Sequence, residues 1–188
     1  MSELIEELLD DAGSRMAKSV EATRNEFATV RTGRASPHLL DRVAVDYYGA
    51  QTPLKQLASI SASEARLLTV TPYDKSSIRS IEKSIMESDL GLTPSNDGNV
   101  IRLTIPELTE ERRRELVKIV RAIAEEGRVA IRNIRRDIMH TLRELKQEGE
   151  VGSDEEHRAE TELQKLTDER ISEIDSFLAG KEEEILEV

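Results

Sequence analysis

The longest helical pattern in this chain of 188 residues covers residues 109–147 and reads TEERRRELVKIVRAIAEEGRVAIRNIRRDIMHTLRELKQ. Apolar side chains recur in it at steps of three and four residues, which places them on one face of a helix. This apolar seam consists of Leu116, Val120, Ile123, Gly127, Ala130, Ile134, Ile138, Leu142 and Leu145. The near-heptad spacing predicts antiparallel packing in a helix bundle. Gly127 lies on the seam although glycine costs about 1 kcal/mol against alanine in a helix, so we expect a close helix approach there.

Two further segments have the same periodicity. Residues 3–30 carry the apolar series Ile5, Leu9, Ala12, Met16, Val20, Thr23, Phe27 and Val30. The turn at residues 148–153 precedes a third helix with the apolar face Leu163, Leu166, Ile171, Ile174, Leu178 and Ile185. Three helices of comparable length can bury one common core, and such an internally satisfied bundle suggests a monomer.

Residues 36–106 differ in character, because all five prolines of the chain lie there. Strands are expected at residues 43–48, 57–60, 67–71 and 100–105, and a helix at residues 76–88. The expected fold class is therefore α+β: an elongated antiparallel three-helix bundle (residues 1–30 and 106–188) with a small β-rich α+β domain (residues 31–105) inserted after the first helix. The two connections predict a hinge, with residues Val30, Arg31, Thr32, Gly33, Arg34, Ile105, Pro106 and Leu108.

The composition excludes several classes of protein. Cysteine is absent, which excludes disulfides, thiolate metal sites and a thiol nucleophile. The first residues are acidic rather than basic and apolar, and no apolar run approaches ~18 residues, so we expect a cytoplasmic protein without a secretory signal or membrane span. The three histidines share no metal-ligand spacing. We expect no metal, no cofactor and no catalytic residues, and hence no enzyme.

The net charge of −11 is unevenly distributed. Residues 109–146 carry 11 basic and 7 acidic side chains, whereas residues 147–188 carry 4 and 15. A polyanion would meet one positive segment in an otherwise neutral or repelling chain, which favours a defined orientation of binding.

That positive segment contains a stripe of basic residues at helical spacing: Arg114, Lys118, Arg121, Arg128, Arg132 and Arg135, widened by Arg136 and Arg143. Guanidinium groups in a row on a rigid helix can follow a nucleic-acid backbone. Four arginines between residues 128 and 136 have no acid among them, and the pattern expected of internal ion pairs is missing there. A solvated helix face paired to acids on neighbouring helices remains an alternative from the sequence alone.

Local strings along the whole chain resemble the bacterial ribosome recycling factor family. They are VRTGRASP at 30–37, YYG at 47–49, TPL at 52–54, SDLG at 88–91, LTEERR at 108–113, RVAIRNIRRD at 128–137 and QKLTD at 164–168. The order, spacing and total length also match the family. A small departure is Gly127, where alanine is common.

The resemblance implies a three-helix bundle hinged to a β-rich domain in an L-shape of roughly transfer-RNA dimensions. It further implies binding to the post-termination ribosome and, with elongation factor G and GTP hydrolysis by that partner, splitting into subunits with release of mRNA and tRNA. Contact with large-subunit ribosomal RNA is implied for Arg132, Arg135 and Arg136, with Arg128 one turn earlier. Periodicity alone also permits a coiled-coil scaffold or chaperone that holds protein partners.

Overall fold

The computed structural model describes residues 2–187, which form two compact units. One unit combines the chain up to Arg31 with Glu111–Leu186, and the other contains Thr32–Glu110. The domain boundaries expected at residues 30/31 and 105/106 stay a prediction. The elements are α1 (Glu3–Thr29), η1 (Pro37–Leu40), β1 (Ala44–Tyr47), β2 (Ala50–Pro53), α2 (Leu54–Leu57), β3 (Ala58–Glu64), β4 (Leu67–Pro72), η2 (Lys75–Ser77), α3 (Ile78–Glu87), β5 (Pro94–Asn96), β6 (Ile101–Thr104), α4 (Glu110–Gln147) and α5 (Ser153–Leu186).

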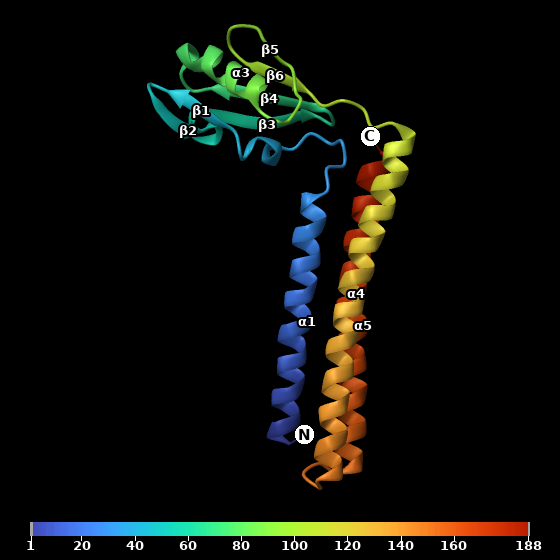
Figure 1. Ribbon diagram of the computed structural model, residues 1–188. Helices are drawn as coiled ribbons and strands as arrows, with labels where there is room; N and C mark the ends of the chain where they lie inside the picture. Colours follow the sequence, from blue (N-terminus) through green and yellow to red (C-terminus); the bar gives the residue numbers. More distant parts are fainter. Residues whose placement is uncertain (1, 188) are drawn as a thin grey trace. The chain divides into compact units, whose positions relative to one another are not determined.

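The first unit is a bundle of α1, α4 and α5, which run alongside one another in Figure 1. Helices α4 and α5 are antiparallel, since Lys146 near the end of α4 pairs with Glu156 near the start of α5, and the earlier Arg121 pairs with the later Glu182. Helix α1 is also antiparallel to α4, because Arg15 pairs with Asp137 while the later Thr23 lies against the earlier Gly127. The predicted antiparallel three-helix bundle is confirmed.

The buried face of α4 is wider than the predicted seam. Seven of the nine seam residues are buried, while Ala130 and Leu145 are half-buried and Ala124 and Ile131 are buried instead. The difference arises because α4 packs against two helices, so the apolar stripe covers a broader arc than a two-stranded seam. The close approach expected at Gly127 is confirmed, since a Cβ atom there would lie 2.9 Å from Ile174 Cδ1.

The second unit is β-rich, as predicted. Strands β3, β4, β6 and β5 form an antiparallel sheet in that order, and β1 and β2 form a separate hairpin. The alternation expected around residues 100–105 is confirmed, because Ile101, Leu103 and Ile105 are buried while Arg102 and Thr104 are exposed. Isoleucines of α3 and alternate residues of β4 and β6 share one core.

Two strands were not predicted, β2 and β5. Both begin or end at a proline and are short, and both pair on one side only. Proline is tolerated at such edges because its missing N–H faces away from the ladder. Within residues 2–187, no helix combines the length and apolar character that a membrane span requires.

Candidate nucleic-acid interface

The basic face of α4 is positioned by the buried face opposite it. Since Ile131, Ile134 and Ile138 are buried in the bundle, the rest of the helix circumference ranges from half-buried beside them to exposed. Arg132 and Arg136 are exposed, whereas Arg128 and Arg135 are half-buried. The four arginines that the family resemblance singled out therefore share one side of α4 but differ in their surroundings.

Arg128 is held by two carboxylates. Its Nε and Nη2 atoms donate to Asp175 Oδ1 of α5 at 2.8 and 2.6 Å, and its Nη1 atom donates to Glu125 Oε2 at 3.1 Å. Only 20% of its side chain is exposed. The hydrogen bond to Asp175 is the largest cause that raises the pKa of Arg128 above its usual value. This guanidinium joins α4 to α5.

Glu125 is shared between two arginines. Its Oε1 atom accepts from Arg132 Nη1 at 3.0 Å while Oε2 accepts from Arg128. The hydrogen bond from Arg132, followed by the one from Arg128, lowers the pKa of Glu125 below its usual value. Glu125 therefore remains charged and offsets part of the positive charge of both neighbours.

The expectation that this part of the stripe lacks ion-pair partners is wrong for Arg128 and Arg132. Glu125 lies three and seven residues before them and reaches both, and Asp175 comes from another helix. Two other basic residues of α4 are also paired, Arg121 with Glu182 at 2.5 Å and Lys146 with the buried Glu156. The alternative of a face paired to neighbouring acids thus describes part of the stripe.

The C-terminal half of the stripe differs. Arg135, Arg136 and Arg143 have no ion pair or hydrogen bond from their side chains to any residue in the range 2–187. Together with Asp137, Met139 and His140 they line a groove of about 440 Å³ on α4. A second groove, of about 610 Å³, lies between α4 and α5; Arg135 and Met139 line it together with the α5 acids Glu160, Asp168 and Glu169. The first groove, whose three arginines have no acidic partner among residues 2–187, therefore suits an anionic ligand better than the second.

The residues of the expected hinge lie in two segments without helix or strand, residues 30–36 and 105–109. Within the β-rich unit, Gly33 has a φ of +77°, and a Cβ atom there would lie 2.8 Å from Leu108 Cγ. The Ala35 N–H donates to the Ala65 carbonyl at 2.7 Å, and the Ile105 N–H donates to the Arg66 carbonyl at 2.8 Å. The two segments are thus fastened side by side to the turn between β3 and β4.

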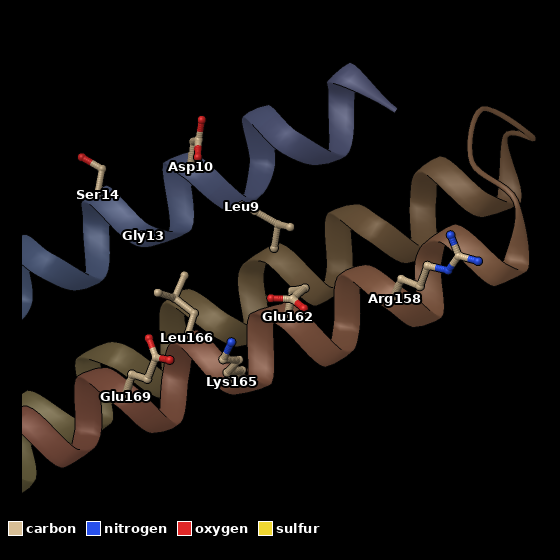
Figure 2. A pocket seen from close by; sticks show the side chains of 9 residues that line it. All are labelled: Leu9, Asp10, Gly13, Ser14, Arg158, Glu162, Lys165, Leu166 and Glu169. Atoms are coloured by element: carbon tan, nitrogen blue, oxygen red, sulfur yellow. The ribbon is translucent and has the colours of Figure 1, made fainter. Parts of the chain in front are cut away.

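A larger groove, of about 690 Å³, lies between α1 and α5. Figure 2 shows Leu9 and Leu166 pointing into the space between these helices, with charged side chains around them. Its rim mixes both signs of charge, Asp10 and Glu162 with Arg158 and Lys165, so it suits a polyanion less well than the α4 face. Among residues 2–187, no group of three or more His, Asp or Glu side chains is arranged to hold a metal ion.

Comparison with known proteins gives one consistent result. The family model described as "Ribosome recycling factor" matches residues 23–186. The ribosome-recycling factor of Rubrobacter xylanophilus is 58% identical over 188 residues, which cover 100% of both chains. That of Bacillus subtilis is 55% identical over 182 residues, 97% of this chain and 98% of the relative.

Solved structures agree with these relatives. A solution structure of the ribosome recycling factor is 44% identical, covers 100% of both chains and superposes with a TM-score of 0.76. A second similar chain belongs to models of the T. thermophilus ribosome recycling factor and the E. coli elongation factor G bound to the E. coli post-termination complex. It is 49% identical, with a TM-score of 0.65 and coverage of 97% of this chain and 98% of that one.

Proposed function

Because this chain belongs to the ribosome recycling factor family, we propose that it binds the post-termination ribosome and, with elongation factor G, splits it into subunits and releases mRNA and tRNA. The observation that carries this proposal is the match over the full length of the chain, at 58% identity to one relative. The similarity to a factor placed with elongation factor G on a post-termination complex supports the choice of partner.

In this proposal the α4 face binds ribosomal RNA of the large subunit. The family resemblance assigns that contact to Arg132, Arg135 and Arg136, with Arg128 one turn earlier, through phosphate oxygens. The distribution of charge supports this RNA contact. Residues 109–146 are positive in a chain with a net charge of −11, so the acidic remainder directs a polyanion towards this face. Phosphate contacts of this kind give binding that weakens steeply with salt.

The β-rich unit does the separating. It swings at two connections, near Val30–Arg34 and near Ile105, Pro106 and Leu108, when elongation factor G acts on it. The packing of Gly33 against Leu108 within the β-rich unit supports a hinge that is confined to fewer residues. These two residues move with the unit, and the rotation occurs at residues 30–31 and 109–110.

The chain itself catalyses no reaction, since GTP is hydrolysed by the partner. It acts as a monomer in the cytoplasm, where post-termination ribosomes are found, and it needs no cofactor.

Sedimentation with purified large subunits tests the RNA contact. We expect the chain to pellet with the subunits at low salt and progressively less between 50 and 200 mM KCl at constant Mg²⁺, a range over which about four phosphate contacts would cost roughly 50–150-fold in affinity. Arg132→Glu should weaken the binding and flatten its dependence on salt.

The matched control is Lys118→Glu, which makes the same charge change on the same helix at an exposed residue. It lies 17 residues before Arg135, or about 26 Å at ~1.5 Å per residue, and should bind like the unaltered chain. Absence of pelleting at every salt concentration would rule out the proposed function and favour a scaffold that binds proteins.

A further inference from the structure

The arginines of α4 fall into two groups with opposite electrostatic surroundings. At Arg128, three N–H groups already donate to carboxylates of Asp175 and Glu125, and the side chain is mostly buried. A phosphate that approached this guanidinium would have to displace both acids. Because a hydrogen-bonded pair of this kind is costly to break, Arg128 offers a polyanion little.

Arg132 is intermediate between the two groups. Among the described residues it donates through Nη1 alone, to the carboxylate that it shares with Arg128, and 49% of its side chain is exposed. Two arginines thus face two carboxylates, Glu125 and Asp175, so the net charge of this part of the face is close to zero.

One to two turns further along, the balance is positive. Arg136, His140 and Arg143 follow at steps of four and three, which aligns them along one side of α4. Arg135 borders the same groove of about 440 Å³. The acid that lines this groove, Asp137, faces Arg15 of α1 at 3.4 Å, and Glu144 faces His140 Nε2 at 3.3 Å. No acid of residues 2–187 pairs with the three arginines.

We propose that the RNA contact is centred on the Arg135–Arg143 cluster, defined as Arg135, Arg136 and Arg143, and that Arg128 is a positioning residue which fastens α4 to α5 without contacting RNA. This inference rests on the proposed function and deepens it. It adds Arg143 to the RNA site and removes Arg128. The ligand is the phosphodiester backbone, which guanidinium groups bind in a bidentate manner.

The slope of log Kd against log salt distinguishes the two groups, because each lost phosphate contact reduces it by about 0.7–0.9. Arg143→Gln should reduce the slope for purified large subunits by that amount and leave the melting temperature unchanged, since the side chain is exposed. Arg143→Lys, which keeps the charge, should restore the slope. Lys118→Gln is the control for an exposed α4 cation outside the cluster and should leave the slope unchanged.

Arg128 is tested with the double variant Arg128→Met and Asp175→Leu. The double variant removes both partners of the pair, of which 20% of the Arg128 and 51% of the Asp175 side chain is exposed, and it leaves the net charge unchanged. The double variant should keep the slope of the unaltered chain. Arg128→Gln alone should lower the melting temperature because it leaves Asp175 without its partner.

Two results would overturn the inference while the proposed function stands. One is steep salt-dependent binding of the unaltered chain that Arg143→Gln does not change. The other is a reduction of the slope by about 0.7–0.9 in the double variant. If the unaltered chain shows no salt-dependent binding at all, the proposed function itself fails, so the two failures are distinguishable.

Discussion

Replacing Gly127 by alanine should destabilise the bundle, although the same change stabilises an ordinary helix. Alanine gains about 1 kcal/mol over glycine in an unobstructed helix. At Gly127, however, the added Cβ atom would fall well inside van der Waals contact with Thr23 Oγ1 of α1 and 2.9 Å from Ile174 Cδ1 of α5. Overpacking of a well-packed core costs about 1–3 kcal/mol.

The upper part of that range applies because the obstructing atom is anchored. Thr23 Oγ1 donates to the Ser19 carbonyl at 2.9 Å, so rotating it away breaks a hydrogen bond. The helices must separate instead, and we expect Gly127→Ala to lower the free energy of unfolding by about 1–2 kcal/mol net of the helix gain. For a chain of this size, that corresponds to a fall of about 2–8 °C in Tm.

Circular dichroism at 222 nm during thermal and urea unfolding measures this change. The matched control is Gly180→Ala, at an exposed helical glycine where an added Cβ atom would have no atom of residues 2–187 within 4 Å. This variant should be more stable than the unaltered chain by about 1 kcal/mol. Thr23→Ala should rescue Gly127→Ala in the double variant, whereas Thr23→Ser, which keeps the oxygen, should not. A Gly127→Ala variant as stable as the unaltered chain would refute the reasoning.

Three further predictions concern charge, pH and the connections. Glu125→Gln should tighten binding to large subunits and steepen its salt dependence, because a carboxylate that offsets two arginines is lost; unchanged sedimentation would contradict this. The pKa of Asp97 is lowered to about 2 by hydrogen bonds from the Val100 and Asn99 N–H groups and then from Arg102. Its stabilising contribution is therefore present above about pH 4 and lost as the pH falls from about 4 to 2. Tyrosine fluorescence reports only on the β-rich unit, because that unit contains all three tyrosines. Unfolding followed by this signal should show that the free energy of unfolding of the unaltered chain exceeds that of Asp97→Asn by less and less as the pH falls over that range; a constant difference would contradict this. Two glycines inserted between residues 31 and 32 should spare large-subunit binding but abolish splitting with elongation factor G; full splitting by this variant would argue against a swing that depends on the connection.

The helical part of the fold could be predicted because its signals are local and repeated. The apolar seam of α4 recurs over 38 residues, so a few misplaced positions do not change the assignment. Burial of Ala124 and Ile131 was missed since it depends on packing against two helices at once, which a single periodicity does not contain.

Short edge strands gave weaker signals. Strand β5 has three residues, Pro94–Asn96, and its sequence is typical of a turn. It is a strand because β6 supplies a pairing edge beside it. Tertiary context decides such segments, and local propensity does not.

At the candidate site, the sequence predicted the basic face of α4. It did not predict which of its arginines pair with carboxylates. One partner was within reach of sequence reasoning, since Glu125 precedes Arg128 by three residues and such pairs are common on helices. Asp175 was not, because it lies 47 residues away and meets Arg128 only through the register of α4 against α5. Arg135, Arg136 and Arg143, which have no acidic partner among residues 2–187, could be recognised only once that register was known.

In the proposed function this chain splits ribosomes and depends on the α4 face to do so. Light scattering of post-termination complexes mixed with the chain, elongation factor G and GTP measures splitting directly. We expect scattering to fall with the unaltered chain and with the control Lys118→Glu, and to stay constant with Arg135→Glu. Constant scattering with the unaltered chain, or splitting by Arg135→Glu at the rate of the control, would contradict the account.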